Sequence, residues 1–412
     1  MKHVILLGVV LTSTGLLTAC ANEPTQTAIA TGMPSTDPNN DMVDMGQTPG
    51  VVTPNETLPV DDTFEPTVQQ TLDYMRYLGP SLIGRVLSDE EETQLAAGVT
   101  AVKPIIEAWV KDDGFVEAVK SMLEIRLGSN GKRGNADFNL PGYIVRHVVK
   151  NNLPWSKVVT SDTCYDAADQ AIPCDTGAPY TAGVLTTRGF LAGNEGRFNL
   201  GRARAMLLTF MCRDYPAEPE LQPYVDKPRL KLMFRASNAD EQMVAEVAGG
   251  FGNGLACFSC HGQFSNHSQP FVKFDKAGTW IADADGSQSM TGQLGESDRG
   301  LMASHFATTT EAASEKAQWF AAEIDNLAGG AAVMAKNPRF HECAVQQLVD
   351  LGVGLDLGFP TGVKGLAVTG DFLTDIASSV TKTSPDPTIQ ELAVATYSDV
   401  RVMAATLDGL KR

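Results

Sequence analysis

The sequence lacks any long hydrophobic run after its first residues, and this absence limits how the chain can meet a membrane. A transmembrane helix needs about 20 consecutive apolar residues, and no stretch beyond the N-terminal segment approaches that length. We therefore expect no membrane-spanning helix, and we expect any membrane contact to come through a covalent lipid alone.

Positive charge is also scarce. No Lys or Arg occurs between Lys2 and Arg76, and the chain has 32 basic against 49 acidic residues, a net charge of −17. Such an acidic chain is repelled by the phosphates of nucleic acids, which bind proteins largely through Lys and Arg. The charge argues against a nucleic-acid partner and favours a protein partner with a cationic docking face; a role of the charge in solubility alone is the alternative.

A second closely spaced cysteine pair is missing as well. The chain has 7 Cys and 6 His, and Cys257 and Cys260 are its one C-x-x-C pair. A zinc ribbon needs two such pairs. A thioredoxin-like pair follows a strand, whereas residues 249–255 are glycine-rich without apolar alternation.

The pair belongs to the run Cys257-Phe258-Ser259-Cys260-His261. C-x-x-C-H is the attachment sequence of haem c, in which two thioethers bind the porphyrin and the histidine ligates the iron. The sequence therefore predicts one covalent haem c with His261 as its proximal ligand. A zinc site, a plain disulfide or a degenerate motif are the alternatives.

The N-terminus has the pattern of an export signal. Met1-Lys2-His3 is short and basic, residues 4–11 are apolar apart from Gly8, and Leu17-Thr18-Ala19-Cys20 follows. This resembles a bacterial lipoprotein signal, which predicts cleavage after residue 19 and a lipid on Cys20. An ordinary secretory signal is the alternative. No aspartate follows Cys20, and we expect an outer-membrane lipoprotein that faces the periplasm or the cell surface.

The domain organisation follows from composition. Residues 20–66 are rich in Pro, Thr, Asn and Asp and have few large apolar side chains, so they predict a disordered acidic tether. We expect an N-terminal helical domain over 67–230 and a haem-binding, cytochrome c-like domain over 231–412.

Apolar residues at helical spacing predict a mainly α protein. The run Ser88-Asp89-Glu90-Glu91 predicts a capping box that opens a helix through Leu95 and Val99. Further helices are expected over ranges that carry apolar stripes: 67–78, 115–127, 143–149, 201–211, 312–327, 343–351 and 388–407.

Cysteine counting predicts two disulfides. Without Cys20 and the C-x-x-C pair, four cysteines remain, an even number in an oxidising compartment. Cys164 and Cys174 bracket a polar loop and form the natural local pair, which leaves Cys212 and Cys343 for a long-range bridge. Free buried thiols are the alternative.

Haem needs an apolar pocket and a second axial position. Aromatic residues near the motif are candidate haem contacts: Phe258, Phe264, Phe271, Phe274 and Trp280. Lys273 and Arg299 are candidate propionate partners. The sixth-ligand candidates are Met302, Met290 and His305, which are close rivals, with Met334 and His341 further along the chain. A Met or His ligand favours an electron carrier, and a vacant position favours an enzyme.

Several phrases resemble the planctomycete-type cytochrome c-like family. The most specific is the haem motif followed by Phe274-Asp275-Lys276-Ala277-Gly278-Thr279-Trp280, similar to the family's Phe-Asp-x-x-Gly-x-Trp. Residues 87–91, 182–192 and Arg339-Phe340-His341-Glu342-Cys343 resemble other family segments. The family's Thr-Ser-Pro is replaced by residues 198–201 before Arg202, and its Asp-Pro-Ile-Gly is missing, so the chain resembles a divergent member.

The resemblance implies an exported haem-binding protein without fixing a reaction. The motif makes a monohaem c-type cytochrome lipoprotein that passes single electrons to a docked redox partner the leading hypothesis. A haem-dependent oxidoreductase or peroxidase-like enzyme is the second. A binding or scaffold lipoprotein whose haem is structural or absent is the third.

Overall fold

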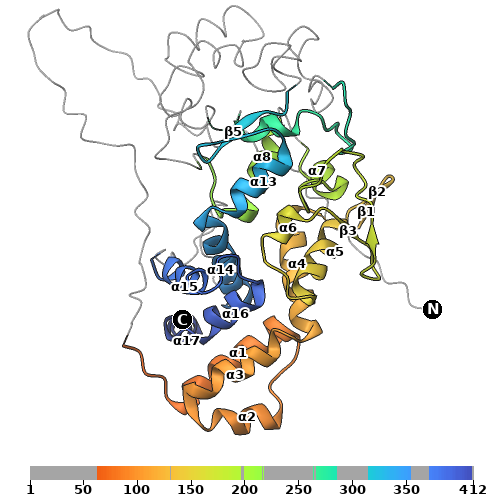
Figure 1. The fold of residues 1–412 in the computed structure, drawn as a ribbon. Coiled ribbons are helices and arrows are strands. Elements are labelled where there is room, and N and C mark those ends of the chain that lie inside the picture. The colour runs from red at the N-terminus through yellow and green to blue at the C-terminus, as the bar shows by residue number, and fades with distance from the viewer. Residues whose placement is uncertain are drawn as a thin grey trace, which may run out of the picture. The chain divides into compact units, whose positions relative to one another are not determined.

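The computed structural model describes residues 63–129, 131–195, 199–215, 217, 263, 266–284, 314–353 and 371–410. This part of the chain is mainly α, as predicted (Figure 1). The predicted signal and all but the last residues of the tether lie outside it. Contacts group Pro54–Arg412 into one compact unit. The predicted domain boundary at residue 230 also falls outside the described residues, but helices from both sides of it pack together.

The first helices begin at local sequence signals. α1 (Val68–Ile83) starts at a capping box between Thr67 and Gln70 and ends at Gly84, which takes the left-handed conformation (φ 68°). The predicted capping box between Ser88 and Glu91 is confirmed at the start of α2 (Asp89–Leu95). α2 ends earlier than expected, because the 3₁₀ helix η1 (Gly98–Ala101) follows and leads into α3 (Val102–Trp109).

The helices predicted over 115–127 and 143–149 are present and pack against each other along their length. α4 (Asp113–Leu127) packs along α5 (Leu140–Lys150). Gly128 ends α4 in the left-handed conformation (φ 62°), which glycine adopts more readily than other residues. Both helices contribute buried side chains to the core: Phe115, Val119, Leu123, Ile144, Val145 and Val148.

The C-terminal helices pack on α1 and α3 rather than only on one another (Figure 1). They are α14 (Pro338–Val353), α15 (Asp371–Thr381), α16 (Ile389–Ser398) and α17 (Val400–Leu410). Tyr74 of α1 donates to the Tyr397 carbonyl at 3.0 Å, and the Tyr397 hydroxyl donates to the Leu348 carbonyl at 2.5 Å. The two buried bonds join residues 323 and 49 positions apart in the chain.

The prediction of one helix over 388–407 is wrong at Asp399. Asp399 adopts an extended conformation (φ −77°, ψ 125°) between α16 and α17. Its carboxylate accepts from the backbone N–H and the guanidinium of Arg401. Asp competes in this way with helical hydrogen bonding, and the chain therefore breaks into two helices there.

The predicted helix over 312–327 is also wrong. The described part of it forms a hairpin of β5 (Ala317–Trp319) and β6 (Ala322–Ile324). Phe320 and Ala321 form its two-residue turn, both with positive φ (47° and 63°). The alanines favour a helix, but the hairpin buries Trp319 and Ile324 on one side, and this burial outweighs helical propensity.

Short elements complete the described chain. Two more hairpins are β1 (Lys132–Arg133) with β2 (Ala136–Asp137), and β3 (Cys164–Tyr165) with β4 (Ala171–Ile172). The remaining helices are α6 (Lys157–Thr160), α7 (Arg188–Gly193), α8 (Leu200–Phe210), η3 (Gln269–Phe271) and α13 (Leu327–Ala335). Within the described ranges, no helix is long and apolar enough to cross a membrane.

Candidate functional site

The structure describes the segment that follows the C-x-x-C-H motif, and the motif itself lies outside the described residues. Of the predicted haem contacts, the structure describes Phe271, Phe274 and Trp280, and it also describes the propionate candidate Lys273. The predicted site residues outside the described chain are Cys20, Cys257, Phe258, Cys260, His261, Phe264, Met290, Arg299, Met302 and His305.

Residues 274–280, which carry the Phe-Asp-x-x-Gly-x-Trp pattern, form a closed turn. Phe274 and Trp280 pair in an antiparallel bridge. Inside the turn, the Asp275 N–H donates to the Thr279 carbonyl at 2.9 Å, and the Asp275 carboxylate accepts from the Thr279 N–H at 2.8 Å. Gly278 has φ 77°, and a Cβ there would lie 2.9 Å from the Leu191 Cβ, so the position requires glycine.

Arg202 clamps this turn from α8. Its fully buried guanidinium donates to the carbonyls of Phe274 (2.9 Å), Asp275 (2.5 Å) and Leu191 (2.9 Å), and to the Asn199 side chain (3.0 Å). Burial lowers the pKa of Arg202 to about 10, against the opposing effect of the Glu195 and Asp275 carboxylates. Arg202 therefore remains a cation at neutral pH.

A second anchor of the segment is an aromatic box formed by Tyr215, His267, Trp319 and Phe320. His267 is fully buried, and its Nδ1 lies 3.0 Å from the Tyr215 hydroxyl. The Trp319 ring meets His267 edge-on at 5.7 Å, and its Nε1–H donates to the Asn266 carbonyl at 2.8 Å. His267 is six residues beyond His261, and this spacing holds the two Cα atoms within about 22 Å of each other.

Sequence reasoning missed the aromatic box. Trp319 and Phe320 lie in the range predicted as a helix, where helical spacing would place them on different faces. The signal for the hairpin is the apolar–polar alternation of residues 317–319 and 322–324, which is too short to decide against an alanine-rich helix.

The aromatic box leads to a testable expectation for Trp319→Phe. This substitution keeps most of the buried ring and removes the donor to the Asn266 carbonyl, so we expect a loss of about 1–3 kcal/mol in the free energy of unfolding. Trp319→Leu also leaves a cavity and should cost more, about 3–5 kcal/mol. Urea unfolding measures both. A Trp319→Phe protein that unfolds at the wild-type urea concentration would contradict the expectation.

A polar cluster joins the same segment to Glu315, two residues before β5. The Tyr180 hydroxyl donates to the Glu315 carboxylate. Burial raises the pKa of Glu315, while Tyr180, Lys273 and Trp280 oppose that rise. The Trp280 Nε1 is buried and faces this carboxylate, but it makes no hydrogen bond of normal geometry with the described residues. Lys273 donates to the carbonyls of Ala282 (2.9 Å) and Ala284 (2.8 Å).

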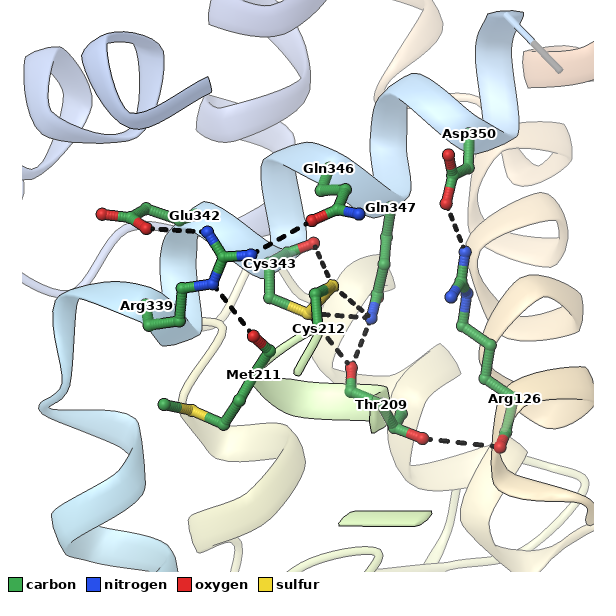
Figure 2. The surroundings of a disulfide bond; sticks show 10 residues. All are labelled: Arg126, Thr209, Met211, Cys212, Arg339, Glu342, Cys343, Gln346, Gln347 and Asp350. Atoms are coloured by element: carbon green, nitrogen blue, oxygen red, sulfur yellow. Dashed lines mark hydrogen bonds and ion pairs between the residues drawn. A yellow bond between two sulfur atoms is a disulfide. The ribbon is translucent and has the colours of Figure 1, made fainter. Parts of the chain in front are cut away.

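Two disulfides have the pairing expected from the cysteine spacing. Cys164 and Cys174 join the ends of the β3–β4 hairpin, with Cα atoms 5.1 Å apart. Cys212 and Cys343, with Cα atoms 5.2 Å apart, connect the end of α8 to α14 (Figure 2). The long-range bridge closes a loop of 131 residues that contains the whole C-x-x-C-H region.

Polar side chains surround the long-range bridge (Figure 2). Gln347 Nε2 donates to the Thr209 carbonyl and approaches the Cys343 sulfur at 3.4 Å. Arg339 donates to the Met211 carbonyl at 3.0 Å and pairs with Glu342 at 3.1 Å. The chain reversal at Cys212 (φ 48°) is therefore held on both sides by α14.

The other described histidines, His147 and His341, contact side chains that belong to the fold. His147 stacks on Tyr165 at 3.5 Å and bonds Asp169 at 2.8 Å, which docks the β3–β4 hairpin on α5. His341 is buried, with Nε2 3.7 Å from Asp386. Met334 is buried in the core. Among the described residues, no group of three or more His, Cys, Asp or Glu is arranged to hold a metal ion.

Comparison with known proteins adds no assignment. No family model matches the chain, and neither the curated proteins nor the solved structures include a match.

Proposed function

We propose that this chain is an exported monohaem c-type cytochrome, anchored by lipid on Cys20, that passes single electrons to and from a docked redox partner. The observation that carries the proposal is the sequence Cys257 to His261, the attachment motif of haem c. Similarity to the planctomycete-type cytochrome c-like family supports the same proposal through the turn that ends at Trp280.

The described surroundings fit a haem. Next to the motif the chain offers buried aromatic rings, including Phe271 and Phe274, as a porphyrin face requires. One buried donor, the Asn199 Nδ2, has no hydrogen-bond partner among the described residues, whereas the Trp280 Nε1 faces the Glu315 carboxylate. An unpartnered donor of this kind matches the need of a haem propionate for polar partners. Lys273 is a weaker propionate candidate, because its ammonium group already donates to two carbonyls.

In this proposal the chain's residues position one group and control access to it. The bound haem supplies a one-electron centre. Cys257 and Cys260 hold it covalently, His261 ligates its iron, and Met302, Met290 or His305 completes the ligation. Arg202 and the aromatic box fix the described segment that follows the motif, at residues 274–275 and at His267, a rigid support of the kind that a bound group needs.

The proposal includes a location and a partner for the cytochrome, which rest on the expected lipid anchor and on the charge of the chain. Lipid on Cys20 would hold the protein at the outer membrane, and residues 20–66 would serve as its tether. An acidic chain with a net charge of −17 favours a redox partner with a cationic docking face.

The decisive experiment is an absorption spectrum of the full chain, expressed with haem-maturation machinery, in the oxidised and reduced states. We expect a low-spin c-type spectrum, and haem that stays attached through acid–acetone extraction. Cys257→Ala with Cys260→Ala should abolish this covalent attachment, whereas Cys164→Ala with Cys174→Ala should keep it.

Three other outcomes would overturn the proposal. A colourless wild-type protein would show that the motif carries no haem. A high-spin ferric spectrum that responds to cyanide and peroxide would indicate an enzyme. A substituted protein that keeps covalent haem would place the attachment elsewhere in the chain.

A further inference from the structure

The Tyr180–Glu315 pair is a titratable site that the electron-carrier function leaves unexplained. Tyr180 lies in the loop before α7, and its hydroxyl donates to the Glu315 carboxylate. The backbone N–H of Leu327, at the start of α13, also faces the Tyr180 hydroxyl. Three separate parts of the chain therefore meet at the Tyr180–Glu315 pair.

The pair contacts the segment that follows the C-x-x-C-H motif. Lys273 and Trp280 of this segment face Glu315. In addition, the Gln269 side chain donates to the carbonyl of Ser314, the residue before Glu315. The carboxyl group therefore packs against the described chain that follows the motif, and its burial reduces screening by solvent.

Three other charged groups nearby, Lys316, Asp325 and Asp275, make contacts that do not involve the Tyr180–Glu315 pair. Lys316 and Asp325 pair with each other at 3.4 Å on the exposed side of the hairpin. The Asp275 carboxylate accepts the Thr279 N–H and closes its own turn. Burial raises the pKa of Glu315 and that of Tyr180, so a proton is retained on this pair above the ordinary range of glutamate.

We propose that Glu315, held by Tyr180, is a proton-exchange site linked to the haem, an inference that rests on the proposed function. When the iron gains one electron from the redox partner, Glu315 takes up one proton from solvent. On oxidation the electron leaves to the partner and the proton returns to solvent. Added negative charge at the iron favours the neutral carboxyl form, which sets this direction.

The test is the haem midpoint potential of the full, haem-loaded chain measured against pH. We expect the wild-type potential to fall as pH rises above the ordinary range of glutamate, and Glu315→Gln to make it independent of pH there. Tyr180→Phe removes a hydrogen bond that favours the ionised carboxylate, so it should move this dependence to higher pH. Glu323→Gln, at an exposed position of the same hairpin, is the matched control and should keep the wild-type dependence.

Infrared spectroscopy supplies an independent readout. The reduced-minus-oxidised difference spectrum should contain a protonated-carboxyl band that is absent in Glu315→Gln and retained in Glu323→Gln. A haem-loaded protein whose potential keeps its pH dependence in Glu315→Gln overturns the proton linkage and leaves the cytochrome proposal intact. A colourless protein overturns the cytochrome proposal itself.

Discussion

Replacement of Cys212 and Cys343 by serine should lower the free energy of unfolding by about 5 kcal/mol, the loop-entropy value for a closed loop of 131 residues. The bridge removes conformational freedom from the unfolded chain, and a long loop loses more freedom than a short one. Urea unfolding of the double variant, or of the wild type under reducing conditions, measures this loss.

The second disulfide provides a matched control. Cys164 and Cys174 close a loop of 10 residues, for which the same relation gives about 2.7 kcal/mol. Cys164→Ser with Cys174→Ser should therefore be the milder double substitution. The ranking would be contradicted if the short-loop variant unfolded at a lower urea concentration than the long-loop variant.

Arg202→Met should cost about 3–5 kcal/mol in the free energy of unfolding, because it leaves buried carbonyl groups without their donor. Three of the four acceptors are backbone carbonyls, and two of these belong to the turn that begins at Phe274. We also expect Arg202→Met to speed up hydrogen exchange at the turn amides of Gly278 and Thr279, and to do so more than at the amides of α14. Urea unfolding and amide exchange measure the two effects.

Arg204 supplies the comparison for Arg202 on the same helix. Its guanidinium pairs with Asp214 near the surface, with the closest contact at 2.5 Å and about a third of its side chain exposed. Arg204→Met should cost no more than about 1 kcal/mol, the usual range for such pairs. If Arg202→Met does not fold, Arg202→Lys retains the charge with fewer donors and should still unfold earlier than Arg204→Met. Equal stability of the Arg202 and Arg204 variants would refute the clamp.

Local signals in the sequence predicted part of this fold correctly. Ser88 and Glu91 form their capping box within one helical turn, and the apolar stripe that begins at Phe115 ends at Gly128 as its sequence indicates. The disulfide pairing followed from counting cysteines and from one short loop. These features depend on neighbours in the sequence or on a small number of possible combinations.

The errors have one physical cause. Residues 317–324 contain alanines that favour a helix, yet they form a hairpin because Trp319 packs against His267, about fifty positions earlier in the chain. The helix expected to continue through Asp399 breaks because that carboxylate binds the Arg401 guanidinium and backbone. In both places a specific contact outweighs a propensity worth less than about 1 kcal/mol per residue.

The sequence by itself determined the helical class, the cysteine pairs and the C-x-x-C-H motif that carries the proposed function, because each follows from residue type, short spacing or a count of the cysteines. Only the tertiary structure decided what surrounds the segment after that motif. The Arg202 clamp, the aromatic box around His267 and the Tyr180–Glu315 pair join residues between 52 and 135 positions apart. Contacts of this range arise from packing of the whole unit, which no local pattern specifies.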